Sequence, residues 1–233
     1  MKTKNRNSMV IFLVLGSLLT LATGCEKESE NDTVTDIDGN VYTMVTIGTQ
    51  VWMAENLRVT RYNDGTSIPM VTDGAEWATL TTPGYCWYDN DGATYKDTYG
   101  ALYNWHAVNT GKLCPEGWHV PTDVEWATLN DYLGGDTIAG GMLKATGTIE
   151  DSDGLWYSPN TGATDEVGFS ALPGGGHYFN GVFGWMGHYG TCWTSTENSS
   201  SHAWTRYMRY DSKSLIRDQY DKKVGYSVRC IKD

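Results

Sequence analysis

The sequence predicts an α+β domain in which short strands joined by turns predominate over a few short helices. Its 27 glycines favour turns, and its ten tryptophans and 15 tyrosines are typical of strands. Long helical patterns are few, and no internal repeat of about 20 to 50 residues stands out. Residues 37–233 therefore fit one domain by length.

The first predicted element is a β-hairpin. Residues 41–47 and 50–53 have strand character and flank the turn residues Gly48 and Thr49. Further along, residues 99–108 predict a short helix despite their glycine.

The clearest predicted helix follows Pro121. Thr122 and Glu125 have the spacing of a capping box, and a pair of glycines ends the pattern. Its apolar face consists of Trp126, Leu129 and Leu133. We expect Trp118 and Trp126 to belong to the core, as most patterned tryptophans do.

The C-terminal region predicts three strands, at residues 203–210, 215–218 and 224–231. In the last strand, alternation places Ser227 and Arg229 on one face. The other face carries Val224, Tyr226, Val228 and Cys230.

Three Asp-x-Asp-Gly motifs occur, at residues 36–39, 89–92 and 151–154. A calcium loop of the EF-hand type requires a glutamate about six residues after its glycine. The residues at those positions are Val45, Thr98 and Asn160. Turns are therefore the preferred interpretation, and one calcium site of another type is the alternative.

The N-terminus has the pattern of a secretory signal peptide. Residues 1–24 combine three basic residues with an apolar run that is too short for a bilayer span of about 20 residues. The run ends in Leu-Ala-Thr-Gly-Cys, which resembles a bacterial lipobox, so Cys25 is the predicted lipidation residue and anchors the chain to the membrane. A signal peptide with an incidental cysteine, or an uncleaved anchor, is the alternative.

Residues 25–36 are polar and acidic and predict a flexible tether. Acidic residues directly after a lipidated cysteine resemble a surface-export signal, which favours the cell surface over an inward-facing outer-membrane lipoprotein. Removing residues 1–24 takes away three basic residues and no acidic one, and changes the net charge from −11 to −14. This charge disfavours nucleic acid as a partner.

The remaining cysteines are Cys86, Cys114, Cys192 and Cys230. An even number in an exported protein predicts two disulfides, and spacing alone leaves three pairings open. No Cys-x-x-Cys motif supports a zinc or redox site.

Enzyme signatures are missing from the sequence. The nucleophile-elbow, zinc-protease and phosphate-loop motifs are absent, and the five histidines are scattered. Glu197 with Asp165 or Glu166 is a weak candidate for the carboxylate pair of a glycosidase. We therefore expect no enzyme, no cofactor and no metal site.

Residues 174–193 are rich in glycine and aromatic residues and nearly free of charge. Exposed rings of this kind stack on sugars or on partner side chains. Tyr178, Asn180 and Trp185 are the candidate ligand-binding residues, the rings for stacking and the amide for hydrogen bonding. The alternative is that the rings of this segment pack in the core.

Six ordered motifs resemble the Fibrobacter succinogenes major paralogous domain, over residues 36–233. They are Ile-Gly-Thr-Gln-Val-Trp-Met-Ala-Glu-Asn-Leu at 47–57, Tyr-Gly-Ala-Leu-Tyr-Asn-Trp at 99–105, Cys-Pro-Glu-Gly-Trp-His-Val-Pro-Thr at 114–122, Gly-Phe-Ser-Ala-Leu-Pro-Gly-Gly at 168–175, Trp-Thr-Ser-Thr-Glu at 193–197 and Gly-Tyr-Ser-Val-Arg-Cys at 225–230. The resemblance implies a C-type-lectin-like fold with short helices and a twisted antiparallel sheet, in surface or secreted lipoproteins. It also implies a Cys114–Cys230 disulfide, which leaves Cys86–Cys192 as the second.

Two functions remain open at this point. The first is a binding module for a glycan or a host or cell-wall polymer. The second is a structural or assembly component of the envelope that recognises protein partners. The lectin-like resemblance favours the first only by analogy of fold.

Overall fold

The computed structural model describes residues 32–233, which form five short α-helices, one 3-10 helix and twelve strands. This arrangement confirms the α+β class. The predicted signal peptide at residues 1–24, the predicted lipidation residue Cys25 and the tether up to residue 31 lie outside the described residues. Within residues 32–233, no helix has the length and apolarity needed to cross a membrane.

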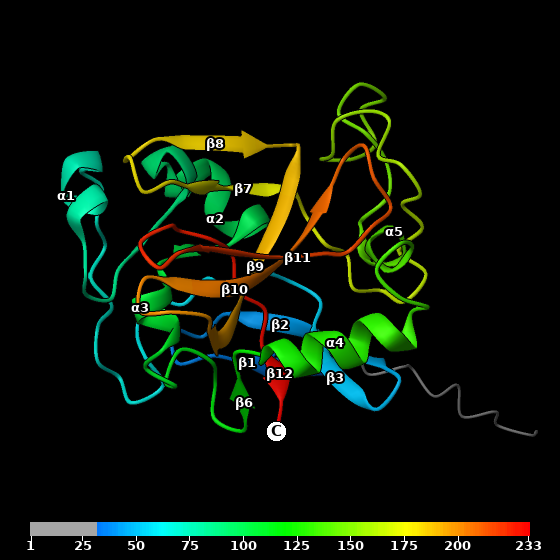
Figure 1. Cartoon of the computed structure of the whole chain (residues 1–233). Coiled ribbons are helices and arrows are strands. Elements are labelled where there is room, and N and C mark those ends of the chain that lie inside the picture. The colour runs from blue at the N-terminus through cyan, green and yellow to red at the C-terminus, as the bar shows by residue number, and fades with distance from the viewer. Residues whose placement is uncertain (1–31) are drawn as a thin grey trace, which may run out of the picture. The chain divides into compact units, whose positions relative to one another are not determined.

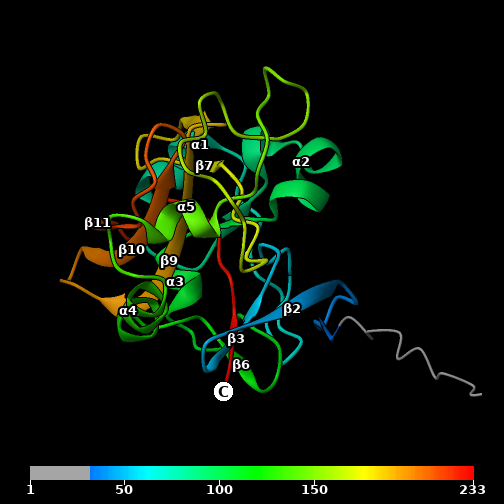
Figure 2. The same cartoon turned by 90° about the vertical axis from the view of Figure 1, so that its right-hand side faces the viewer.

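Figures 1 and 2 show these elements in two views related by a 90° turn. In chain order they are β1 (Thr33–Thr35), β2 (Val41–Ile47), β3 (Gln50–Met53), α1 (Gly74–Thr79), β4 (Tyr85–Cys86), η1 (Tyr88–Asn90), α2 (Gly92–Tyr99), β5 (Leu102–Tyr103), α3 (Trp105–Val108), β6 (Trp118–His119), α4 (Asp123–Tyr132), α5 (Ala139–Leu143), β7 (Gly174–His177), β8 (Phe183–Met186), β9 (Tyr189–Glu197), β10 (His202–Arg209), β11 (Ile216–Asp221) and β12 (Ile231–Lys232). The two longest strands, β9 and β10, are neighbours in one sheet.

A five-stranded antiparallel sheet, in the order β1-β2-β3-β12-β6, joins early and late parts of the domain. β2 and β3 form the predicted hairpin, and Gly48 in its turn has a φ of 61°. A Cβ atom at Gly48 would lie 2.9 Å from the ring of Tyr132, so the end of α4 can pack on this turn only because glycine is there. The Cys114–Cys230 disulfide, which the family resemblance implied, is present next to β12.

The ordered domain begins inside the predicted tether, so the boundary expected for residues 25–36 is corrected. Residues 33–35 form β1, which pairs with β2. Val34 packs against the core, and the buried Asp36 carboxylate accepts a hydrogen bond from the Tyr42 hydroxyl. Backbone pairing with an existing strand orders this polar segment although it has few apolar side chains.

The single helix predicted at residues 99–108 is wrong. Gly100 has a φ of 74°, and a Cβ atom there would lie 2.7 Å from the carbonyl oxygen of Leu57. The backbone therefore leaves the helical conformation at this glycine, where α2 ends. β5 follows, and α3 begins only after Asn104, whose side chain caps it.

The predicted helix after Pro121 is confirmed as α4. The side chains of Thr122 and Glu125 form both reciprocal hydrogen bonds of the capping box. All three predicted apolar residues are buried: Trp126, Leu129 and Leu133. The Trp126 ring lies 4.9 Å from that of Trp52 on β3, measured between ring centroids. Trp118 on β6 is buried as well, as expected.

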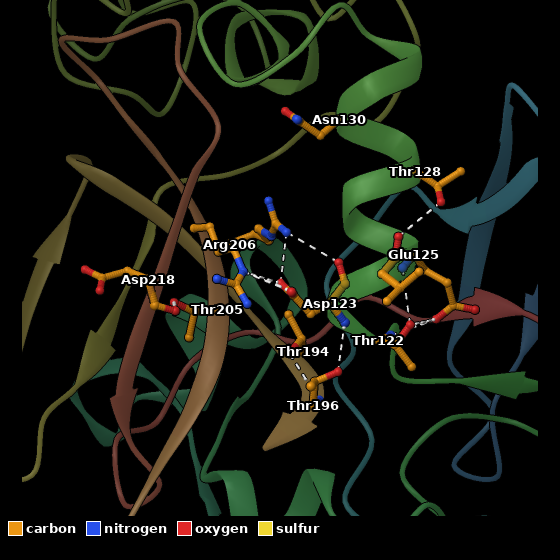
Figure 3. A network of polar contacts seen from close by, with 12 residues as sticks. Thr122, Asp123, Glu125, Thr128, Asn130, Thr194, Thr196, Thr205, Arg206 and Asp218 are labelled. Atoms are coloured by element: carbon orange, nitrogen blue, oxygen red, sulfur yellow. Dashed lines mark hydrogen bonds and ion pairs between the residues drawn. The ribbon is translucent and has the colours of Figure 1, made fainter. Parts of the chain in front are cut away.

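A second antiparallel sheet, in the order β11-β10-β9, contains the strands predicted at residues 203–210 and 215–218. One of its faces binds the first turn of α4 (Figure 3). Arg206 of β10 and Arg217 of β11 each place a guanidinium nitrogen 2.9 Å from the Asp123 carboxylate. These ion pairs fix the side of the sheet that faces the helix.

The strand predicted at residues 224–231 is regular only at β12. Residues 225–227 instead make isolated bridges to three separate segments, at Tyr103, His177 and Cys192. The segment is buried on both faces, because it passes between those segments rather than along one neighbour. Arg229 is fully buried and donates hydrogen bonds to the Asn56 side chain and to two backbone carbonyls.

The Asp-x-Asp-Gly motifs use their carboxylates for local structure. Asp36 and Asp153 each accept a backbone N–H within a turn, and Asp91 caps the first turn of α2. This agrees with the turn interpretation. In the part of the chain that the structure describes, no group of three or more His, Cys, Asp or Glu residues is arranged to hold a metal ion.

Candidate ligand-binding groove

One face of the second sheet is rich in aromatic side chains. Side chains alternate between the two faces of a strand, and the register of β9, β10 and β11 shows which residues share a face. The face opposite Arg206 carries Tyr189, Thr191, Tyr207 and Tyr220. This face is therefore turned away from the ion pairs with α4.

The antiparallel ribbon of β7 and β8 packs beside β9 (Figure 1). Two more rings come from this region: Trp185 of β8 and Tyr178, which directly follows β7. The glycines of β7 make the close packing possible. A Cβ atom at Gly176 would lie 2.6 Å from the ring of Tyr226. At Gly175, whose φ is 60°, it would lie 2.3 Å from a backbone oxygen of β8.

Two adjoining cavities lie between the ribbon and the sheet. The smaller has a volume of about 220 Å³ and is lined by Tyr178, Trp185, Tyr189, Thr191, Tyr207, Tyr220 and Tyr226. The larger has a volume of about 390 Å³ and is lined by Tyr178, Phe179, His202, Gln219, Tyr220, Asp221 and Val224. Tyr178 and Tyr220 line both cavities, so the two form one aromatic groove. Its larger part falls in the range of about 300–1,000 Å³ typical of ligand pockets.

The rings of the aromatic groove hold one another in place. Trp185 and Tyr189 meet at 76° with centroids 5.4 Å apart, and Tyr220 and Tyr226 meet at 82° with centroids 5.3 Å apart. Tyr178 and Tyr226 are also perpendicular, at 6.3 Å. Edge-to-face contacts of this kind are the favoured geometry of aromatic pairs. The groove is thus formed before any ligand binds.

Tyr178, Tyr207 and Tyr220 of the groove remain protonated at neutral pH. Burial, together with the nearby Asp218 carboxylate, raises the pKa of Tyr220 to about 12. Burial also raises the pKa of Tyr178 and of Tyr207. Each phenol can therefore donate and accept hydrogen bonds. Within residues 32–233, the residues that line the groove include Asp221 but no lysine or arginine.

The structure brings two of the three candidate ligand-binding residues together. Tyr178 is half-buried and lines both cavities, and Trp185 is 55% exposed and lines the smaller one. Asn180 is exposed in the turn between β7 and β8, where its side-chain oxygen accepts the N–H of Val182 at 3.2 Å. It lines neither cavity.

In residues 174–193, some aromatic side chains line the groove and others are packed in the core. Phe183 stacks on the fully buried His177, and Trp193 is also fully buried, so these residues belong to the packed interior. The sequence reasoning did not single out the groove residues of β10 and β11, Tyr207 and Tyr220. Tyr207 lies in a predicted strand, but Tyr220 lies beyond the strand predicted at residues 215–218, and only the pairing register shows that the two share a face.

The predicted second disulfide is wrong, because Cys86 and Cys192 are free, buried thiols. They belong to different core clusters and therefore do not meet. Burial raises the pKa of the Cys86 thiol, and it raises that of Cys192 to about 11. Neither is a reactive thiolate at neutral pH. The Cys86 sulfur lies 3.3 Å from Nδ1 of His177.

Other residues considered for chemistry have local structural contacts. The His119 ring lies between two carboxylates, with Nδ1 2.6 Å from Asp233 and Nε2 2.9 Å from Glu125. These contacts give His119 a structural role. Glu197, a candidate member of a carboxylate pair, forms an ion pair with Lys222.

Fold and groove together define a disulfide-linked α+β domain with a preformed aromatic groove beside its second sheet. The family model of the Fibrobacter succinogenes major domain matches residues 45–232, and the chain belongs to this family. No curated protein and no solved structure matches the chain.

Proposed function

We propose that this chain is a non-catalytic binding module whose aromatic groove binds a glycan. The observation that carries the proposal is the pair of adjoining cavities, which share the rings of Tyr178 and Tyr220. Ring faces stack on the C–H faces of sugars, and phenol, amide and carboxylate groups hydrogen-bond to sugar hydroxyls. Gln219 and Asp221 supply such groups in the larger cavity.

We further propose that the domain has a C-type-lectin-like fold and is displayed on the outer surface of the outer membrane by lipid on Cys25. The Cys114–Cys230 disulfide and the mixture of short helices with antiparallel sheets support the fold. The lipobox-like run before Cys25 and the acidic residues after it support the location. Replacing Cys25 with alanine should release the protein from membranes in a fractionation experiment, and continued retention of C25A would refute the anchor.

The groove is tested by titrating the full chain, purified in detergent, with glycans selected on an array. Tyr220→Ala and Trp185→Ala should each weaken binding about fivefold, because a ring contact contributes about 1 kcal/mol. Tyr132→Ala removes an exposed tyrosine of α4 and serves as the matched control. Unchanged affinity in both groove variants would exclude the groove as the binding site.

The second candidate is a structural or assembly component of the envelope that recognises protein partners. It is favoured by the exposure of Phe179 and Val182, each 57% exposed in the loop between β7 and β8. Exposed apolar side chains that lie close together mark interaction sites. Crosslinking in cells would then recover a defined protein partner that is lost in Val182→Ser, whereas glycan binding would be unaffected because Val182 lines neither cavity.

A further inference from the structure

We propose that the aromatic groove recognises a free, positively charged amino group, so that its ligand is a glycan containing non-acetylated amino sugars. This inference rests on the proposed glycan-binding function and specifies the substrate class. The ammonium group would occupy the smaller cavity, and the sugar ring would lie in the larger one.

The walls of the smaller cavity suit a cation. Six of its seven lining side chains are aromatic. The face of an aromatic ring is electron-rich and attracts an ammonium group within about 6 Å of its centroid. Five of the rings are tyrosines, whose phenol oxygens can accept hydrogen bonds from the three N–H donors of a primary ammonium. An acetylated amine has neither the charge nor these three donors.

Carboxylates beside the rings add negative charge. Alternation along β11 places Asp218 on the groove face together with Tyr220, and Asp218 is half-buried. It is near enough to raise the pKa of both Tyr207 and Tyr220. Asp221 lines the larger cavity. Among the described residues, neither carboxylate takes part in an ion pair.

Two basic side chains on the neighbouring elements, Arg209 and Lys222, are neutralised by other carboxylates. The Arg209 guanidinium lies 5.8 Å from the centroid of the Tyr189 ring, but it donates two hydrogen bonds to Asp211, at 2.8 and 2.6 Å. Lys222 is buried and forms an ion pair with Glu197. The groove therefore keeps an excess of negative charge, which attracts a cationic ligand and repels an anionic glycan.

The test is calorimetric titration of the full chain in detergent, at slightly acidic pH, with three hexasaccharides. They are β-1,4-linked glucosamine, its N-acetylated counterpart and galacturonic acid, which are cationic, neutral and anionic. We expect glucosamine hexamer to bind at least tenfold more tightly than its acetylated counterpart, and galacturonic acid hexamer to bind most weakly.

Two variants locate the effect in the groove. Asp218→Asn removes the charge but keeps the shape, and should reduce the preference for glucosamine hexamer to less than threefold. Asp131→Asn removes the same charge from an exposed position on α4, so it controls for long-range attraction to the acidic chain. Trp185→Leu removes an exposed ring. It provides a second test of binding in the groove if Asp218→Asn fails to fold.

The possible results separate this inference from the proposed function. If both glucosamine-based hexamers bound with equal affinity, and Trp185→Leu abolished the binding of both, the amine preference would be overturned. Glycan binding in the groove would remain intact. Affinities insensitive to every groove variant would overturn both. If Asp131→Asn and Asp218→Asn reduced the preference for glucosamine hexamer equally, the preference would come from general charge attraction, and the amine site would be overturned. Tighter binding of a lysine-containing peptide at the same site would assign the ammonium to a protein partner instead.

Discussion

The two sheets of the domain cover their aromatic residues to different extents. On and beside the five-stranded sheet, Trp52, Trp118 and Trp126 are buried. Trp126 of α4 packs on Trp52, and Trp118 belongs to the core cluster that contains Cys114 and Cys230. Beside the three-stranded sheet, Trp185 is 55% exposed and the tyrosines line cavities. The short β7–β8 ribbon packs beside this face. Whether an aromatic ring is buried or exposed thus depends on what packs over it, and not on its residue type.

The largest effect that tests this contrast is expected from Trp126→Ala. The side chain is fully buried and contacts Trp52, with ring centroids 4.9 Å apart, so its loss should reduce the free energy of unfolding by about 3–5 kcal/mol. Trp185→Ala, the matched substitution at the groove, should change it by only about 0.5 kcal/mol. Urea denaturation of both variants measures the difference. Equal losses would place Trp185 in the core and remove the basis for the groove.

The disulfide is expected to have the next largest effect. Cys114 and Cys230 are separated by 116 residues, and the chain-entropy model gives about 5 kcal/mol for closing a loop of this length. Removal of a native disulfide typically costs about 2–5 kcal/mol, so the double variant with alanine at both positions should lose that much. Cys86→Ala and Cys192→Ala break no covalent bond and serve as controls. A double variant as stable as these controls would contradict the stabilising role of the bond.

The elements that could be predicted are those whose signals are local. The β2–β3 hairpin shows its two strands and its turn within 13 residues, from Val41 to Met53. α4 shows its cap, its apolar face and its glycine stop in the same way. The Cys114–Cys230 pairing came from family resemblance, since spacing left three pairings open.

The parts that could not be predicted depend on partners distant in the sequence. β1 is polar and forms a strand only because its backbone pairs with the edge of β2. Residues 224–231 show strand alternation, yet they are divided among three neighbouring segments. The groove requires the register of three strands, which brings Tyr189, Tyr207 and Tyr220 to one face. Periodicity could not reveal any of these contacts.

Asp123 and Glu125 of α4 connect this helix to the two sheets, and their contacts are lost in different pH ranges because the partner of Glu125 is a histidine. Glu125 contacts His119 of the five-stranded sheet, and Asp123 contacts Arg206 and Arg217 of the other. Burial tends to raise the pKa of Asp123, but the two arginines lower it overall. Its contribution is therefore present above the ordinary pKa of 3.8 and is lost as pH falls through the lowered value.

The smallest effect we predict is that of His119→Gln. Burial tends to lower the pKa of His119, but its hydrogen bonds to Asp233 and Glu125 raise it above the ordinary value of 6.5. Its contribution to stability is thus complete below pH 6.5 and is lost as pH rises through the raised pKa. Because the ring is 37% exposed, the contribution should be below about 1 kcal/mol. Unfolding measured against pH should show this loss in the native chain and in Asp123→Asn, but not in His119→Gln. If His119→Gln retained the full loss near neutral pH, another group would have to be responsible, and the pH-dependent link between α4 and the five-stranded sheet would be disproved.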